Sequence, residues 1–494
     1  MKKKNMSMYA VMAAMFLTAM LVFGAGCGGG DSAAAPGDLE ALDEFGVTTS
    51  EDLRNMFNIS SSDLADDVDS SDSAGINNKD WLLLRLGELS TCAWKNSMGG
   101  VGSYKITYST TNAKGDVVKA TGAVLVPYTF SGHNVPMLVI QHPTEVERKK
   151  SPSASVKNKY TYNADIQMWL SWLCASMGYV VVMPDYLGMG DNYDIHPYCH
   201  ENLADSIVDI VAAIAGPDFK AKNWGPYTPS TWDKKNIYLM GFSEGAYATV
   251  VGAKRMQDRD YMNRRFGAGL LIPTPTGVVA YDGPYSLSET MRDVMRTAGP
   301  EFSSPYFLPY TLSGYDSVYA STMPEFGFRR NVRNDVSKYK DYPGELLKVM
   351  DGIHTADEIT DLMIDPFSPD NYIGPRTILT AAFSDDLADV NSKVCKALAS
   401  NDAFRGWTPT MKLQLFHHVS DDLVPHGNMD EARKAWQTGS GNIGYESFKR
   451  YVPISKKLYD EKIWHIDAFL IGFVKAVYWV DNQAYNRLIL NPGD

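Results

Sequence analysis

The feature that most restricts the fold of this chain is a series of continuous apolar runs separated by turns and helical patterns. Residues 135–147 (VPMLVIQHPTEVE) and 175–190 (ASMGYVVVMPDYLGMG) each contain such a run, and residues 201–216 carry apolar side chains at helical spacing. A run without alternation is typical of a strand that is buried on both faces. The order therefore predicts an α/β fold with a mostly parallel, doubly wound sheet, whose functional residues gather at the carboxyl ends of the strands.

Two segments depart from this order. Residues 104–127 alternate polar and apolar side chains around an Asn-Ala-Lys-Gly turn, which predicts a β-hairpin at the antiparallel edge of the sheet. Between residues 286 and 405, aromatic, proline-rich and helical pieces replace the strand–helix rhythm. We expect this insertion to form a largely helical cap. The core would then comprise residues 81–285 and 406–494.

The first 27 residues contain three lysines, then an apolar run of about sixteen residues, then small residues that end at Cys27. This composition is typical of a secretory signal peptide. The end of the segment, Ala-Gly-Cys, also resembles a bacterial lipoprotein box, in which Cys27 would be lipidated. We therefore expect an exported protein that is anchored to a membrane through Cys27 and faces the periplasm or the cell exterior, or that is otherwise secreted.

Residues 28–80 are strongly acidic. Within residues 31–80, thirteen Asp and Glu face only Arg54 and Lys79, which gives a local charge of −11. Few apolar residues accompany them in SSSDLADDVDSSDS, so we expect 28–80 to be a flexible, solvated spacer. No basic and aromatic stretch suggests a nucleic-acid partner.

Four cysteines follow the predicted signal, and an exported chain permits disulfides between them. They allow three pairings, of which Cys174–Cys199 is favoured: Cys92, Cys174, Cys199 and Cys395. The oligomeric state does not follow from the sequence.

Ser243 lies in the segment NIYLMGFSEGAYATVV, between a predicted buried strand and a helix. The bare Gly-x-Ser-x-Gly pattern is weak, because it arises by chance in roughly one chain in four of this length. A serine hydroxyl is a poor nucleophile at neutral pH and needs a histidine to accept its proton and a carboxylate to orient that histidine. After a strand-turn-helix serine, the chain order is acid and then histidine.

Two downstream residues meet that order. Asp421 ends the strand-like part of MKLQLFHHVSDDLVP, with Asp422 as a solvated neighbour. His465 follows the strand-like ESFKRYVPI and precedes the amphipathic IDAFLIGFVKAVYWV. The predicted triad is Ser243, Asp421 and His465.

A rival arrangement remains open. The segment RTILTAAFSDDL is a possible strand that ends at Asp385, and MKLQLFHH could then supply His417 or His418 as the base. This alternative leaves the last strand and helix of the chain without a role.

Taken together, these motifs resemble the α/β-hydrolase fold. The segments TYSTTNAKGDVVKATGAVLVP, PDYLGMGDNYDIHPYCHENLADSIVDIVAA and YDGPYSL are similar more narrowly to the secretory lipase group of that superfamily. The resemblance covers roughly residues 100–480.

The resemblance implies a serine hydrolase that cleaves carboxylic esters of small molecules or lipids without a cofactor or metal. Ser243 would attack the acyl carbonyl, His465 would act as base and then as acid, and Asp421 would hold the imidazole. The backbone N–H groups of Glu244 and Thr144 would bind the oxyanion.

Other functions remain open. One is a peptidase or amidase of the prolyl oligopeptidase type, although such enzymes usually carry a β-propeller and the sequence has no matching repeat. Another is a non-catalytic surface protein that binds through its cap. The spacing of His196, Cys199 and His200 in HPYCH is compatible with zinc, but packing near the functional edge is the stronger interpretation.

Overall fold

The structure is a computed structural model that describes residues 34–58, 78–96, 99–158, 165–267, 269, 272–299, 302–335, 339–363, 375–437, 442–450 and 464–488. The predicted signal peptide, including Cys27, lies outside these residues. Residues from Ala35 onward form one compact unit. In the part of the chain that the structure describes, no helix combines the length and the apolar character needed to cross a bilayer.

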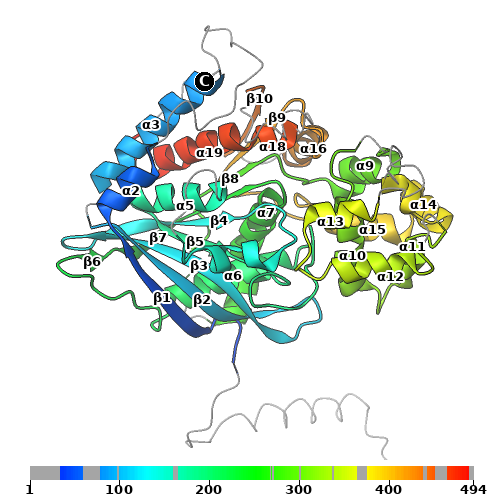
Figure 1. The fold of residues 1–494 in the computed structure, drawn as a ribbon, viewed down its shortest axis with the longest axis horizontal. Helices are drawn as coiled ribbons and strands as arrows, with labels where there is room; N and C mark the ends of the chain where they lie inside the picture. The colour runs from blue at the N-terminus through cyan, green and yellow to red at the C-terminus, as the bar shows by residue number, and fades with distance from the viewer. Residues whose placement is uncertain are drawn as a thin grey trace, which may run out of the picture. The chain divides into compact units, whose positions relative to one another are not determined.

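A mixed β-sheet forms the centre of this unit (Figure 1). In spatial order its main path is β1 (Leu39–Thr48), β2 (Val101–Thr111), β3 (Val117–Thr129), β5 (Val180–Pro184), β4 (Asn134–Gln141), β7 (Thr231–Phe242), β8 (Gly277–Tyr281), β9 (Lys412–His418) and β10 (Ile443–Phe448). A short strand, β6 (Thr228–Pro229), pairs with β3 off this path. From β5 to β10 all neighbours pair in parallel, which confirms the predicted mostly parallel sheet.

The predicted hairpin is the antiparallel pair β2 and β3. It is not the outermost edge, because β1 pairs antiparallel with β2 from the other side. The prediction of a flexible spacer is therefore wrong for residues 39–57, which form β1 and helix α2 (Ser50–Met56). The acidic residues of β1 are compatible with an edge strand as well as with a solvated coil, because both expose charged side chains to solvent.

Apolar contacts hold helix α2 to the core, although several residues of the helix are charged. Leu53 and Phe57 are buried, and the Phe57 ring meets the Trp169 ring edge-on at 5.5 Å between centroids. The Trp169 indole N–H donates to the Met56 carbonyl at 2.8 Å. The core of the protein thus begins at β1 and not at residue 81.

Helices cover both faces of the sheet, as expected for a doubly wound fold (Figure 1). One face packs against α6 (Leu203–Ala215), α7 (Glu244–Gln257) and α8 (Arg259–Phe266), and the other against α3 (Asn78–Asn96), α5 (Ile166–Ser176) and α19 (Phe469–Ala484). Shorter elements of the core are the 3₁₀ helix η2 (Arg148–Lys150), α4 (Pro152–Ser155), α16 (Gly427–Trp436) and α18 (Trp464–Asp467).

A helical insertion connects β8 to β9 and forms the cap, which Figure 1 shows beyond one end of the sheet. Its helices are η3 (Leu287–Met291, a π-helix), α9 (Arg292–Thr297), α10 (Phe307–Tyr319), η4 (Pro324–Phe326), α11 (Phe328–Asn331), α12 (Tyr342–Val349), α13 (Ala356–Asp361), η5 (Pro375–Ile378), α14 (Ala381–Ala388) and α15 (Lys393–Ser400). The possible strand that would have ended at Asp385 is in fact helix α14.

The four described cysteines are all buried and unbonded to one another: Cys92, Cys174, Cys199 and Cys395. The favoured Cys174–Cys199 disulfide is therefore wrong. Cys174 lies in α5 on one face of the sheet, whereas Cys199 belongs to the core cluster of the opposite face.

Candidate active site

Ser243 lies at the carboxyl end of β7, where the strand turns sharply into α7. Its φ of 56° and ψ of −125° are a conformation that a non-glycine residue rarely adopts. The strain is tolerated because the neighbouring positions have no side chain. A Cβ on Gly241 would come within 2.2 Å of the Gly245 carbonyl oxygen, and a Cβ on Gly245 within 2.2 Å of the Gln141 carbonyl oxygen.

The structure brings Ser243 together with Asp421 and His465. His465 Nε2 lies 2.8 Å from Ser243 Oγ, and His465 Nδ1 lies 2.6 Å from Asp421 Oδ2. All three side chains are buried. The Phe242 ring stacks on the His465 imidazole at 4.7 Å between centroids, which fixes the plane of the ring.

One oxygen of Asp421 is held by backbone groups of its own loop. This oxygen, Oδ1, accepts the N–H groups of Leu423 at 3.0 Å and Val424 at 2.7 Å. The other oxygen, Oδ2, thereby remains available to His465.

Asp422 was predicted to be only a solvated neighbour of Asp421, but it also accepts a hydrogen bond from the backbone. Its Oδ1 accepts the backbone N–H of His465 at 3.0 Å, which ties the start of α18 to the loop after β9. Desolvation raises the pKa of the half-buried Asp422 carboxyl, and the hydrogen bond from His465 opposes that rise.

Burial by itself lowers the pKa of His465, but the charge of Asp421 and its hydrogen bond outweigh burial, so the pKa is raised overall. A raised pKa makes His465 a stronger base toward the Ser243 hydroxyl. The arrangement can therefore accept the serine proton and stabilise the resulting imidazolium.

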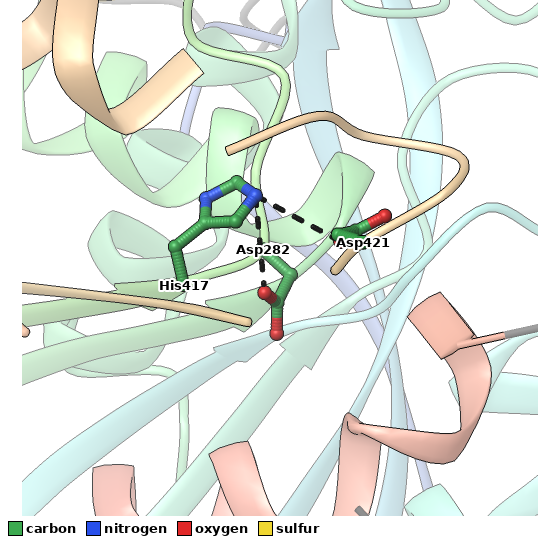
Figure 2. A group of neighbouring side chains, drawn as sticks. All are labelled: Asp282, His417 and Asp421. Carbon is green, nitrogen blue, oxygen red and sulfur yellow. Dashed lines mark ion pairs between the residues drawn. The ribbon is translucent and has the colours of Figure 1, made fainter. Parts of the chain in front are cut away.

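A second buried carboxyl lies beside Asp421 and was not predicted from the sequence. Figure 2 shows Asp282, His417 and Asp421 facing one another at the ends of β8 and β9. His417 Nε2 lies 3.9 Å from Asp282 Oδ1 and 3.8 Å from Asp421 Oδ2. Desolvation and the charge of Asp421 raise the pKa of the Asp282 carboxyl well above its usual value.

These three residues are the group in the described chain whose ligand atoms lie close enough to hold a metal ion. Their hydrogen bonds do not fit that role. His417 Nε2 contacts the Val424 carbonyl oxygen at 2.8 Å, and a carbonyl oxygen only accepts, so this nitrogen carries a proton and offers no lone pair. Burial lowers the pKa of His417 to about 4, so the ring is neutral and the proton on Nε2 is the one that it carries.

Neither candidate base of the rival arrangement, His417 or His418, forms a hydrogen bond with Ser243 among those described. The His418 backbone N–H donates to Asp282 Oδ1 at 2.6 Å, and its ring Nδ1 accepts the Ser420 backbone N–H at 3.2 Å. With Asp385 in the cap helix α14, the structure contradicts the rival arrangement.

The two expected oxyanion donors lie at the nucleophile. Glu244 is the first residue of α7, so its backbone N–H has no acceptor within the helix. Thr144 and Ser243 both line an open cavity of about 1000 Å³. Their role as donors stays a prediction.

The HPYCH residues do not form a zinc site. His196 Nε2 lies 2.6 Å from Glu244 Oε1, whereas His200 Nε2 lies 3.1 Å from the Tyr319 hydroxyl of α10. The two histidines thus point to different partners.

Two cavities meet at Ser243 and His465. The first is narrow, about 70 Å³, and extends into the cap between apolar side chains, among them Met291, Val294, Met295, Phe307, Leu308 and Leu398. The second is the open cavity beside Thr144, whose described lining includes charged residues, among them Glu145, Lys149, Lys150 and Lys157. Ser243 therefore faces an apolar pocket on one side and a wide, polar opening on the other.

Comparison with solved structures identifies proteins of similar fold. A putative hydrolase from Legionella pneumophila matches with a TM-score of 0.64 at 22% identity, over 92% of this chain and 100% of its own. The rice cell wall degrading esterase LipA from Xanthomonas oryzae matches with a TM-score of 0.62 at 17% identity, over 92% and 100%. Candida antarctica lipase A in its closed state matches with a TM-score of 0.54 at 14% identity, over 93% and 84%.

No family model and no curated protein matches the sequence. At these identities the structural likeness shows the fold, and together with the sheet order it establishes that this chain has an α/β-hydrolase-like fold. It does not assign the chain to the secretory lipase group, which stays a resemblance of the sequence.

Proposed function

We propose that this chain is an exported serine hydrolase that cleaves carboxylic esters through an acyl-enzyme intermediate. The observation that carries the proposal is the unbroken hydrogen-bond chain from Asp421 through His465 to Ser243. The names of the structural neighbours, an esterase, a lipase and a putative hydrolase, support the same class of reaction.

In the acylation step, Ser243 Oγ attacks the ester carbonyl carbon while its proton passes to His465 Nε2. The carbonyl π electrons move to the oxygen, which the N–H groups of Glu244 and Thr144 stabilise. Asp421 holds Nδ1–H and balances the charge of the imidazolium. Collapse of the intermediate breaks the bond to the alcohol oxygen, which takes the proton from Nε2, and the acyl group stays on Ser243.

Deacylation repeats these steps with water as the nucleophile. Water gives a proton to His465 Nε2 as it attacks the acyl carbon. The second tetrahedral intermediate then expels Ser243 Oγ, which recovers its proton from His465. The products are a carboxylic acid and the free enzyme.

The two cavities suggest how the ester is placed. A narrow apolar pocket in the cap suits the acyl group, since burial of methylene groups stabilises binding by about 0.8 kcal/mol each. The open cavity beside Thr144 then receives the alcohol part and admits water. Acylglycerols and similar acyl esters are the proposed substrate class.

The test is hydrolysis of p-nitrophenyl esters from acetate to palmitate by the mature protein. Ser243→Ala should lower kcat by about 10⁴-fold or more, because the nucleophile is lost. Ser400→Ala, which changes an exposed serine of α15, is the matched control and should leave turnover unchanged. A fluorophosphonate probe should label the wild type and the control but not Ser243→Ala.

Two results would contradict the proposal. Turnover that persists in Ser243→Ala would exclude Ser243 as the nucleophile. Absence of both turnover and labelling in the wild type would favour a non-catalytic binding protein, while labelling with turnover of peptide substrates alone would favour a peptidase or amidase.

Export and anchoring are proposed from the sequence of residues 1–27. Lipidation of Cys27 would attach the enzyme to a membrane that faces the periplasm or the cell exterior. Labelling of the expressed protein with palmitate should disappear in Cys27→Ala, and labelling that persists would refute the anchor.

A further inference from the structure

The segment 196–198, His-Pro-Tyr, contacts both residues proposed to bind the oxyanion. His196 Nε2 lies 2.6 Å from Glu244 Oε1, and the Tyr198 hydroxyl accepts the Thr144 hydroxyl at 3.2 Å. Glu244 and Thr144 come from different strands of the sheet, after β7 and after β4. One short loop thus spans the two halves of the proposed oxyanion hole.

The contact between His196 and Glu244 is a buried hydrogen bond between two ionisable groups. His196 Nδ1 lies 2.8 Å from the Leu187 carbonyl oxygen, so Nδ1 donates there and Nε2 faces Glu244 Oε1. Burial by itself lowers the pKa of His196, but the charge of Glu244 and its hydrogen bond outweigh burial, so the pKa is raised overall, as expected of an ion pair. The His196 and Glu244 side chains are only 4% and 0% exposed. In the described chain the other oxygen of Glu244, Oε2, has no hydrogen-bond partner, so His196 is what holds this carboxylate.

The pair is enclosed by the cap. Tyr310 of α10 stacks on His196 with 5.8 Å between ring centroids, and its hydroxyl donates to the Glu145 carbonyl at 3.2 Å, next to Thr144. A Cβ on Gly314 of α10 would come within 2.8 Å of both the His196 carbonyl oxygen and the Tyr198 nitrogen. Helix α10 therefore packs directly against the segment 196–198 and restricts its movement.

We propose that His196 and Tyr198 are positioning residues that hold the two oxyanion donors in register through the Glu244 and Thr144 side chains. The inference rests on the proposed function. Its physical basis is that a donor must lie about 2.7–3.1 Å from the developing oxyanion, so that a displacement of about 1 Å costs roughly 10²-fold in rate. His196 holds the side chain of Glu244, the residue whose backbone N–H is proposed to bind the oxyanion.

Kinetic variants test the inference. His196→Ala and Glu244→Ala should each lower kcat about 10- to 100-fold with little change in KM, since ground-state binding in the cavities is kept. Tyr198→Phe removes one hydroxyl and should lower kcat several-fold. His200→Ala, in the same loop but bonded to Tyr319, is the matched control and should keep kcat within about twofold.

Glu244→Gln separates positioning from general loss of packing. A glutamine N–H can donate to Nε2 of a neutral His196 whose Nδ1–H still donates to Leu187, so the chain of hydrogen bonds is complete without charge. This variant should recover at least about tenfold of the kcat lost in Glu244→Ala. No recovery would indicate that the side chain does not act by positioning.

Affinity for a trifluoromethyl ketone distinguishes a positioning role from a merely structural one, because a structural role would leave this affinity unchanged. This ketone forms a tetrahedral adduct with the serine and places an oxyanion between the donors. Its inhibition constant should rise by the same factor by which kcat/KM falls in each variant. Loss of activity that follows only the melting temperature or KM, with unchanged relative affinity for the ketone, would overturn the inference.

The ion pair is tested directly in the unmodified protein. With ¹⁵N-labelled histidine, an NMR titration should give His196 a pKa above that of free histidine, and this rise should be lost in Glu244→Gln. A His196 pKa that is not raised in the wild type would overturn the ion pair even if other variants fail to fold. Ser243→Ala separates the two hypotheses, because an active Ser243→Ala refutes the function, whereas a dead Ser243→Ala with unaffected His196→Ala refutes the inference alone.

Discussion

The carboxylate of Asp421 accepts two backbone N–H groups on one oxygen and the imidazole N–H of His465 on the other. Asp421→Asn should therefore lower kcat about 10⁴-fold, because the amide favours the wrong tautomer of His465. Asp422→Asn keeps an oxygen for the His465 backbone N–H and should lower kcat far less. Measured kcat values for both variants check this order.

Asp385→Asn is the control for that prediction. Asp385 lies in α14 of the cap and belonged to the rival triad. Full activity is expected. If Asp385→Asn abolishes turnover while Asp421→Asn keeps it, the assignment of the acid is wrong.

The raised pKa of Asp282 predicts that the stability of the protein depends on pH. Its pKa is raised in the folded protein, so above the unfolded pKa near 3.9 the folded state binds more protons than the unfolded state. The free energy of unfolding then falls as pH rises, by up to about 1.4 kcal/mol per pH unit until the folded pKa is passed. Asp282→Asn mimics the protonated form and should remove this loss.

Urea unfolding of the wild type and Asp282→Asn between pH 5 and pH 8 checks the sign. The variant should gain stability relative to the wild type as pH rises. The same pH slope in both proteins would show that Asp282 ionises as readily in the folded state as in the unfolded chain.

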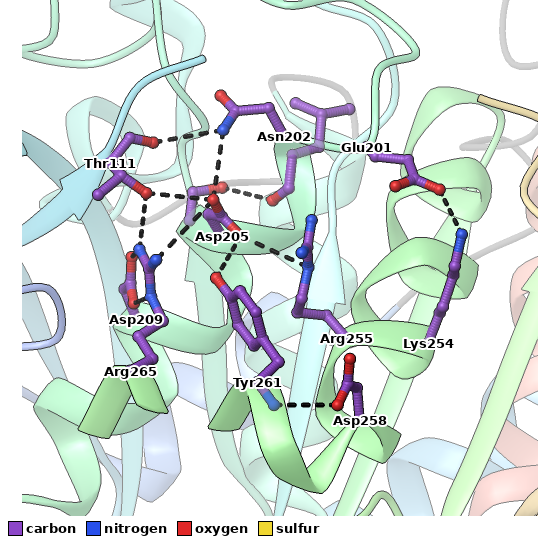
Figure 3. Close-up of polar contacts among 12 residues, drawn as sticks. Thr111, Glu201, Asn202, Asp205, Asp209, Lys254, Arg255, Asp258, Tyr261 and Arg265 are labelled. Carbon is purple, nitrogen blue, oxygen red and sulfur yellow. Dashed lines mark hydrogen bonds and ion pairs between the residues drawn. The ribbon is translucent and has the colours of Figure 1, made fainter. Parts of the chain in front are cut away.

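At the scale of elements, a buried polar network fastens α6, α8 and β2 to one another. Arg265 of α8 donates two hydrogen bonds to Asp209 of α6, Nε to Oδ1 at 2.6 Å and Nη2 to Oδ2 at 2.5 Å. Figure 3 shows these side chains beside Thr111, Asp205 and Tyr261. The same Nη2 donates to Thr111 Oγ1 of β2 at 2.9 Å. Tyr261 donates to Asp205 Oδ1 at 2.7 Å and extends the network along both helices.

Removal of one partner from this network leaves a buried charge without compensation. The Arg265 and Asp209 side chains are 10% and 0% exposed, so Arg265→Ala should lower the free energy of unfolding by about 3–5 kcal/mol. The control is Arg329→Ala, whose ion pair with Asp341 is 60% and 53% exposed, so that solvent screens it and its loss should change stability little. Equal losses in the two variants, measured by chemical denaturation, would contradict a structural role for the network.

At the scale of the whole molecule, the core extends into the acidic N-terminal region. A chain that starts at Ala35 keeps β1 and α2, whereas a chain that starts at residue 59 exposes the edge of β2 and loses the burial of Leu53 and Phe57. We expect the shorter chain to melt roughly 5–10 °C lower and to aggregate through its unpaired strand.

Thermal unfolding and light scattering of the two truncated proteins measure this difference. The chain from Ala35 should match the full-length protein in melting temperature. Identical melting of the two truncations would show that β1 and α2 add nothing to stability, as expected of a spacer.

Sequence patterns with a short period determined most of the fold. Strands buried on both faces, the amphipathic α6 and the hairpin of β2 and β3 each follow from neighbouring residues, because burial selects apolar side chains at spacings set by the local backbone. The same local logic singled out Ser243, since the strained turn needs glycine at 241 and 245. Chain order then selected Asp421 and His465, and in the structure His465 contacts both Ser243 and Asp421.

Only the tertiary structure decided which distant groups meet. Asp282 faces Asp421 because β8 and β9 are neighbours, and His196 contacts Glu244 although 48 residues separate them in sequence, so neither contact has a local pattern. The acidic segment from residue 39 was misassigned for the same reason. Its charges suit a solvated coil and an edge strand equally, and the pairing with β2 that distinguishes them lies about sixty residues away.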